Sequence, residues 1–290
     1  MTPYFDFSEA AVAALAQADV ARALQEDVGS GDLTAGLIDP ARPAKARILA
    51  REAATICGAP WAQSALMQLD PNVRLQWLVP EGQRCVPDQV VLEMQGSARS
   101  LLTAERTALN FLQLLSAVAT KTATYCDAVQ SVPGNRAHIV DTRKTLPGLR
   151  LAQKYAVRMG GGTNHRIGLY DAVLIKENHI AAAGGVKAVL ARAAAVAPSA
   201  KFVEIEVETL AQLAEALDCG ATMVLLDNMN LDQLRQAVQI NAGRAILEVS
   251  GGVNLSTVQG IAATGVDRIS IGALTKDVQA IDFSMRFQEL

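Results

Sequence analysis

The sequence has few of the residues on which several protein classes depend. Its four cysteines lie far apart and form no CxxC pair, which argues against structural zinc or a disulfide framework and favours reduced thiols in a cytoplasmic protein. Charges interrupt every apolar run before it reaches the length of a membrane span, and the N-terminal MTPYFDFSEA lacks the pattern of a signal peptide. We therefore expect neither secretion nor membrane insertion.

Aromatic residues and net charge are also scarce. Aromatics make up 4% of the chain, the net charge is -3 and the pI is about 5.7. Nucleic-acid binders usually combine a basic balance with interleaved aromatics, so we expect no nucleic-acid partner. Apolar residues, in contrast, make up 50% of the 290 positions, which is enough for the core of one barrel-sized domain or two smaller domains.

Cationic side chains cluster in one stretch, positions 141–179, although the net charge of the chain is negative. Two of the three histidines fall in this stretch. The other cations there are Arg143, Lys144, Arg150, Lys154, Arg158, Arg166 and Lys176. Such a local density in an acidic chain indicates a site for a small anionic ligand rather than a basic surface.

The first part of the chain mixes helical and strand patterns. Ser8 is a good N-cap for an Ala-rich helix over 9–26. Further elements are expected as strands over 44–53, 73–79 and 89–94, a helix over 61–69 and a long helix over 97–130. We predict an N-terminal α+β domain over residues 1–115, which the long helix connects to the second half of the chain.

After that helix, short apolar runs alternate with Ala-rich helical stretches, a pattern that predicts βαβ units with parallel strands. The runs are 138–140, 172–175, 203–207, 222–226, 245–249 and 268–271. Six strands are fewer than the eight of a complete barrel, so either the barrel is incomplete or a strand is hidden in the long segments. Polar residues follow most of these runs, where barrel enzymes place their active sites.

Individual features of this second half have simpler alternatives. An Asp at a strand end is more often a helix N-cap than a catalyst, and the glycines 160–162 match a turn or a helix C-cap after Met159 at least as well as a phosphate loop. Glu204, Glu206 and Glu208 alternate along one strand and share one face. Their carboxylates would repel one another unless cations or a metal lie opposite, although the outermost can simply be solvated.

Several blocks together resemble the quinolinate phosphoribosyltransferase family. The blocks occur in family order over nearly the whole chain: EDVGSGDLTA (26–35), ERTALN (105–110), DTRKTLPGLR (141–150), GGGTNHR (160–166), DAVLIKENH (171–179), EIEVETL (204–210), LLDNM (225–229), SGGVN (250–254) and GVDRISIGALT (265–275). The resemblance implies an open α/β barrel over 116–275 and an N-terminal α+β sandwich-like domain that the tail 276–290 completes. It also implies transfer of phosphoribosyl from phosphoribosyl pyrophosphate (PRPP) to quinolinate, with loss of carbon dioxide.

The resemblance also implies roles for individual residues. Arg143, His165 and Arg166 match residues that hold the quinolinate carboxylates, and Arg106 matches an arginine that the partner subunit of a homodimer supplies. The candidate catalytic residues are Lys144, Lys176, Glu206 and Asp227. The candidate substrate-binding set is Arg106, Thr142, Arg143, Lys144, His165, Arg166, Lys176, Glu206, Asp227, Ser250, Gly251, Gly252 and Gly272.

Magnesium is the cofactor that the resemblance implies, with Glu206 and Asp227 as candidate ligands beside the pyrophosphate of the substrate. Two alternatives stay open at this stage. The first is a phosphoribosyltransferase of the same fold that acts on nicotinate or another acid, including the paralogue associated with molybdenum transport. The second, a non-catalytic binding protein, does not account for the two lysines and the acidic pair.

Overall fold

The computed structural model describes residues 5–288, and these residues divide into two compact units. Residues 5–123, 146–160 and 275–288 form the sheet unit, and residues 124–145 and 161–274 form the barrel unit. Neither unit is continuous in sequence, because helix α4 (Arg150–Met159) groups with the sheet unit. The domain boundaries expected at 115 and 275 stay a prediction.

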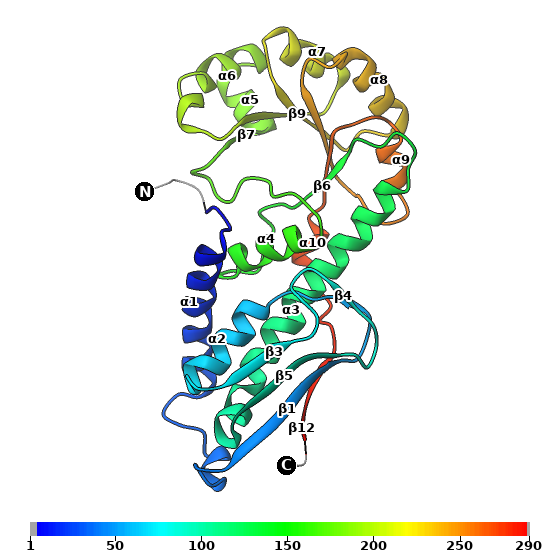
Figure 1. Cartoon of the computed structure of the whole chain (residues 1–290). Coiled ribbons are helices and arrows are strands. Elements are labelled where there is room, and N and C mark those ends of the chain that lie inside the picture. Colours follow the sequence, from blue (N-terminus) through cyan, green and yellow to red (C-terminus); the bar gives the residue numbers. More distant parts are fainter. Residues whose placement is uncertain (1–4, 289–290) are drawn as a thin grey trace. The chain divides into compact units, whose positions relative to one another are not determined.

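The sheet unit contains a four-stranded sheet with the order β12-β1-β5-β3, whose strands pair antiparallel (Figure 1). Its strands are β1 (Pro43–Ala50), β3 (Arg74–Trp77), β5 (Val90–Ser97) and β12 (Phe283–Gln288). In β1, Ala44, Ala46 and Ile48 are buried while Pro43 and Lys45 are exposed, as expected for a strand with one face on the core. Because β12 pairs with β1 along its length, the end of the chain adds an edge strand to this sheet.

Helices of the sheet unit begin and end close to their expected positions. In α1 (Glu9–Asp27), the Oγ of Ser8 accepts the backbone N–H of Ala11 at 3.4 Å, which confirms the predicted N-cap. The other helices of this part are α2 (Ala59–Leu69), α3 (Ala98–Gln130) and the 3-10 turn η1 (Ala35–Leu37). The prediction missed the short pair β2 (Ala54–Thr55) and β4 (Arg84–Cys85), which are too short to show a periodicity.

In the barrel unit, the described residues include a six-stranded parallel sheet with the order β6-β11-β10-β9-β8-β7. The strands are β6 (His138–Val140), β7 (Val173–Ile175), β8 (Val203–Val207), β9 (Met223–Asp227), β10 (Ile246–Ser250) and β11 (Arg268–Ser270). This confirms the six predicted strands. Since β6 and β7 lie at opposite edges and do not pair, the barrel is open.

Helices of the barrel unit lie on the outer side of the strands in Figure 1. They are α5 (Glu177–Ala183), α6 (Val186–Ala193), α7 (Leu210–Asp218), α8 (Leu231–Asn241) and α9 (Val258–Ala262), with the 3-10 turn η2 (Ala197–Ser199). The short helix α10 (Ala273–Lys276) crosses the boundary between the two units in the sequence. The strands carry buried apolar residues such as Ile205, Val224 and Val249. All six strands run in the same direction, so their carboxyl ends meet at one edge of the sheet.

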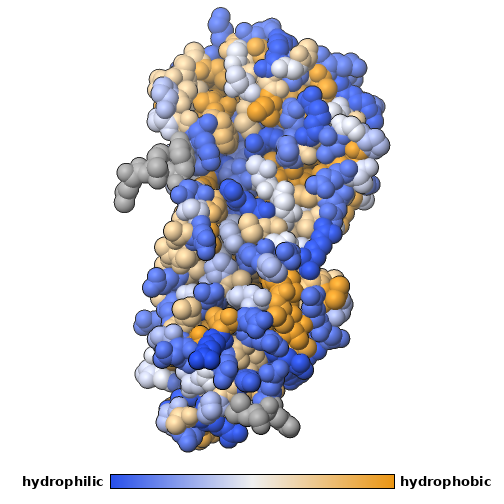
Figure 2. Space-filling view, in the orientation of Figure 1, coloured by the Kyte–Doolittle hydropathy of each residue, from blue (hydrophilic) through white to orange (hydrophobic). Residues whose placement is uncertain are grey.

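On the face that Figure 2 shows, polar residues cover much of the surface of each unit, and apolar residues form scattered patches. The exposed large apolar side chains include Leu33, Leu37, Leu169 and Tyr170. Within residues 5–288, no helix combines the length and the apolar character needed to cross a lipid bilayer.

Candidate active site

A cavity of about 320 Å³ lies at the carboxyl ends of the barrel strands. Every one of the six strands, or the residues directly after it, contributes to its wall. The lining residues are Thr142, Arg143, Lys144, His165, Arg166, Leu174, Lys176, Glu206, Leu225, Glu248, Ser250 and Ser270. Eight of the residues that the sequence singled out are therefore brought together here: Thr142, Arg143, Lys144, His165, Arg166, Lys176, Glu206 and Ser250.

Two guanidinium groups give the cavity a positive wall. Arg166 is buried, and burial, followed by repulsion from Arg143, lowers the pKa of its guanidinium. A buried cation that faces a like charge is stabilised when an anion binds between them. Guanidinium groups also match the two oxygens of a carboxylate, so this wall suits a carboxylate ligand.

Lys144 lies at the same end of the cavity, against Gly272. The backbone N–H of Lys144 donates to Thr142 Oγ1 at 3.1 Å, which closes a tight turn after β6. A Cβ added at Gly272 would lie 3.1 Å from Lys144 Cδ and 3.7 Å from Thr142 Oγ1. Glycine at 272 therefore leaves the space that the side chain of Lys144 occupies.

The acidic pair expected at the cavity mouth comes from neighbouring strands. Glu206 Oε2 lies 2.8 Å from Lys176 Nζ, and the side chain of Glu206 is 11% exposed. Asp227 ends β9 next to Ser250 of β10, and its Oδ2 accepts the Nδ2 of Asn228 at 2.9 Å. Burial is the main cause that raises the pKa of Asp227. Asp227 is not among the residues that line the cavity itself.

The turn after β10 has a backbone that requires glycine. Gly251 has φ 99° and Gly252 has φ 62°, both in the left-handed region. A Cβ at Gly251 would collide with the side chain of Asn228, so this turn packs closely against the turn after β9. Backbone N–H groups in such turns suit phosphate oxygens.

The glycines 160–162 serve a different purpose from the glycine at 251. Gly160 is the C-cap of α4, directly after Met159, which confirms the helix-end alternative. A Cβ at Gly160 would collide with the carbonyl oxygen of Ala119 in α3, so this glycine also permits close packing of two helices. The cavity-lining residues of this block begin after the glycines, at His165 and Arg166.

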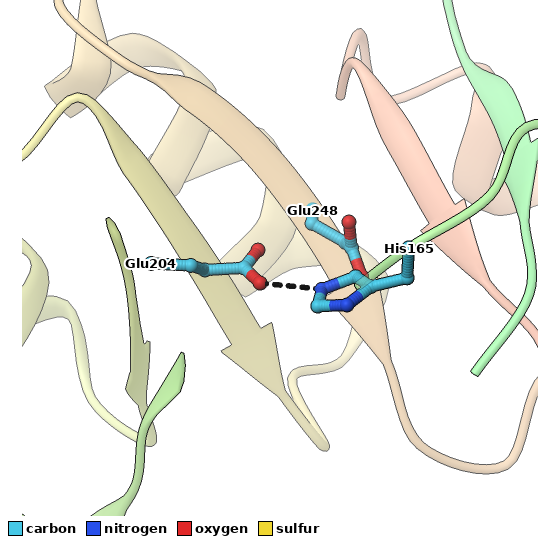
Figure 3. A group of neighbouring side chains, drawn as sticks. All are labelled: His165, Glu204 and Glu248. Carbon is cyan, nitrogen blue, oxygen red and sulfur yellow. Dashed lines mark hydrogen bonds and ion pairs between the residues drawn. The ribbon is translucent and has the colours of Figure 1, made fainter. Parts of the chain in front are cut away.

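At the floor of the cavity, Nε2 of His165 faces two buried carboxyl groups, those of Glu204 and Glu248 (Figure 3). Nε2 of His165 is 2.7 Å from Glu204 Oε2 and 3.7 Å from Glu248 Oε1. Arg268 Nε donates to Glu248 Oε2 at 2.7 Å. Burial raises the pKa of both glutamates to about 7, with the charge of Arg268 opposing the shift at each of them.

The buried Glu204 and Glu248 and the partly exposed Arg268 are absent from the candidate set. A signal for them exists in the sequence, because side chains two positions apart share a strand face. Glu204 precedes Glu206, Glu248 precedes Ser250, and Arg268 precedes Ser270 by two residues each. Applying this alternation to every strand with a polar end would have found all three.

Arg106 belongs to the other unit. It lies on α3 in the sheet unit, its side chain is 69% exposed, and it is 3.9 Å from Glu105 of the same helix. It is not among the cavity-lining residues. Its role, like the roles of the other candidates, stays a prediction.

The fold and the cavity define a class: an α/β-barrel enzyme with a site for anionic substrates at the strand ends. Family models for the C-terminal and N-terminal domains of quinolinate phosphoribosyl transferase match residues 118–286 and 32–116. The chain belongs to the quinolinate phosphoribosyltransferase family.

Individual relatives resemble this chain over most of its length. The nicotinate-nucleotide pyrophosphorylase (carboxylating) of Mycobacterium leprae is 43% identical over 276 residues, 92% of this chain and 95% of that protein. The probable nicotinate-nucleotide pyrophosphorylase (carboxylating) of Bacillus subtilis is 39% identical over 260 residues, 90% of this chain and 89% of that protein. The structure of the nicotinate-nucleotide pyrophosphorylase from Francisella tularensis matches with a TM-score of 0.91 and 42% identity, covering 95% of this chain and 97% of that one.

Proposed function

We propose that this protein transfers phosphoribosyl from PRPP to quinolinate and releases pyrophosphate and carbon dioxide, giving nicotinate mononucleotide for NAD biosynthesis. The observation that carries the proposal is the cavity wall, where Arg143, Lys144, Arg166 and Lys176 surround one space beside Glu206. Both substrates are polyanions, and their charges must be compensated before they can approach each other. Family membership supports the same reaction.

Quinolinate carries two carboxylates on adjacent ring carbons. Arg143 and Arg166 suit these carboxylates because each guanidinium can donate two parallel hydrogen bonds. Lys144 and Lys176 then lie where the pyridine ring and the ribosyl phosphates meet, and their ammonium groups offset the charge of both substrates. Ser250 and Gly251 offer a hydroxyl and backbone N–H groups to the phosphates.

The bond changes follow from the chemistry of the substrates. The pyridine nitrogen attacks the anomeric carbon of the ribose while the bond to pyrophosphate breaks, and Glu206 and Asp227 stabilise the positive charge that develops on the sugar. The ribosylated ring nitrogen is cationic. When the bond between C2 and its carboxylate breaks, the electron pair remains at C2 beside this cation, and a proton from solvent completes the product.

Magnesium fits the residues at the cavity mouth. Glu206 and Asp227 supply carboxylate oxygens, which are the donors that Mg²⁺ prefers. The pKa of Asp227 is raised mainly by burial, so the neighbouring cations do not fully compensate its charge. We propose that these two residues hold the ion, which when bound compensates the charge of the departing pyrophosphate.

We further propose that the protein works as a homodimer in which Arg106 serves the site of the partner subunit. Arg106 is exposed on α3, and exposed apolar side chains lie in the segment bound to this helix. Leu33 and Leu37 are 92% and 84% exposed. Asp32 accepts the Oγ1 of Thr103 on α3 at 2.8 Å, which places this apolar segment beside the helix. Such a surface suits contact with a second copy.

Mixing two inactive variants tests the shared site. Arg106→Ala and Arg143→Ala dimers should regain activity when their subunits exchange, because a mixed dimer contains one site with both arginines. We expect up to about a quarter of wild-type activity, since about half of the dimers are mixed and each has one intact site. Demonstrated exchange without recovery would count against the shared site.

Turnover with the purified protein tests the reaction itself. We expect release of pyrophosphate and carbon dioxide with quinolinate and PRPP, and much slower turnover with nicotinate. Equal or faster use of nicotinate without carbon dioxide would favour the alternative phosphoribosyltransferase. Ligand binding without pyrophosphate release would favour the non-catalytic alternative.

We also propose a cytoplasmic location. The four cysteines are free thiols, in agreement with this location.

A further inference from the structure

The segment 164–168, which carries Arg166 into the cavity wall, is neither helix nor strand. Two buried aspartates hold its two ends. Asp141 accepts the Nδ2 of Asn164 at 2.7 Å and the backbone N–H of His165 at 2.8 Å. Asp171 accepts the backbone N–H groups of Ile167 and Gly168, both at 2.8 Å. Carboxylates thus replace the backbone partners that a helix or strand would provide.

The ring of His165 holds the middle of the segment. Its Nδ1 accepts the backbone N–H of Arg166 at 2.8 Å, and its edge packs at right angles on Phe202 with ring centroids 5.2 Å apart. An imidazolium has no acceptor nitrogen, so this bond selects the neutral ring with its proton on Nε2. Nε2 then donates to Glu204 Oε2.

Glu248 lies beside the same ring on the neighbouring strand β10, without a hydrogen bond to it. Its Oε2 accepts from Arg268, which fixes the carboxyl group with Oε1 3.7 Å from the ring Nε2. A metal ion between these groups would need ligand atoms that face a common point at about 2.0–2.2 Å. The 2.7 Å contact between Nε2 and Glu204 is a direct hydrogen bond, so the geometry of the group fits a support for the ring rather than a metal centre.

We propose that Glu204 is a positioning residue, which anchors a neutral His165 so that the adjoining peptide holds Arg166 against the substrate carboxylate. The proposal deepens the proposed function and rests on it for the identity of the anion. Glu204 does not line the cavity and acts through the imidazole. This distinguishes it from Glu206, two positions further along β8.

Kinetics of matched variants test the proposal. In the Glu204→Ala protein, we expect the KM for quinolinate to rise at least about tenfold, while the KM for PRPP changes less than about threefold. In the Glu204→Gln protein, the amide oxygen can still accept, and we expect the KM for quinolinate to stay within about threefold of wild type. Glu215→Ala, an exposed glutamate of α7, is the control for a general loss of charge.

Two kinetic results would overturn the proposal. One is a Gln variant whose KM for quinolinate rises as much as that of the Ala variant. The other is an equal rise in the KM values for quinolinate and PRPP. A spectroscopic measurement is independent of activity and needs no Ala variant. The ¹⁵N shifts of the His165 ring, assigned by their absence in His165→Gln, should show the neutral tautomer protonated on Nε2 at pH 7. An imidazolium signal at pH 7 would also overturn it. Wild-type protein that does not turn over quinolinate would contradict the proposed function. The ¹⁵N spectrum of His165 would still test the neutral ring on which the positioning role depends.

Discussion

The floor and the mouth of the barrel cavity use the same residue type in different ways. At the floor, Glu204 is fully buried and bonded to His165. At the mouth, Glu206 faces Lys176 and stays in contact with the cavity. The two glutamates share one strand face and differ by two positions, so depth along β8 separates a support from a group that can meet the substrate.

The cost of burial explains why the floor needs its own cation. A carboxylate without water is strongly destabilised unless a charge or hydrogen bonds compensate it. Arg268 bonds Glu248 directly, and its charge also opposes the pKa shift of Glu204. At the mouth, lysines that can also contact a substrate provide this compensation.

The largest effect on activity is expected from a change at the mouth of the cavity. Glu206→Gln removes the charge that would stabilise the developing positive charge on the ribose, and we expect kcat to fall by about 100- to 1000-fold. The melting temperature should stay within about 4 °C of wild type, because the group is not a buried support. Steady-state kinetics with calorimetry would check both. A variant that keeps wild-type kcat would remove the distinction between mouth and floor.

The buried glutamates at the floor should instead make the free energy of unfolding depend on pH. Glu204 and Glu248 have folded-state pKa values near 7, above the ordinary 4.5, so the folded protein holds protons that the unfolded chain releases. Their contribution is fully present below pH 4.5 and is lost as the pH rises through 7. We expect unfolding by urea to be easier at pH 8 than at pH 5, and the two groups contribute as a coupled pair because the charge of Glu204 itself raises the pKa of Glu248. The Glu204→Gln/Glu248→Gln double variant should show a flatter profile, and an unchanged profile would contradict the assignment.

A smaller effect on activity is expected from a change in the turn after β10, which we propose binds the phosphates of PRPP. Gly251→Ala places a methyl group against Asn228 at a positive φ, a strain of about 1 to 3 kcal/mol. We expect the KM for PRPP to rise about tenfold while the KM for quinolinate changes less. Gly243→Ala is a matched control, since Gly243 also has a positive φ of 79° but has no heavy atom near the added Cβ.

The smallest effect is expected beyond the mouth, at the third alternating glutamate. Glu208 is exposed after the end of β8. Glu208→Gln should change the free energy of unfolding by less than about 0.5 kcal/mol and leave kcat within about twofold. A large loss of activity would show that the catalytic mouth extends further than Glu206.

The periodicity of the sequence predicts much of the barrel. Apolar runs between Ala-rich stretches identify all six strands. The polar ends of these runs supply six of the eight predicted cavity residues, and His165 and Arg166 come from the block after the glycines 160–162. Glu248 and Arg268 were missed because Glu248 lies inside an apolar run and Arg268 begins one, so each looks like an isolated charge. Only their pairing across β10 and β11, in the register Glu248↔Arg268, shows that the two charges compensate each other.

The sequence by itself determined the parallel strands, the order of the polar blocks and the family, because these follow from local periodicity and residue identity. The tertiary structure decided which carboxylates support and which face the cavity. That choice depends on burial and on partners distant in sequence, such as His165 for Glu204 and Lys176 for Glu206. A glutamate has the same chemistry at both positions, and its access to water and cations sets its role.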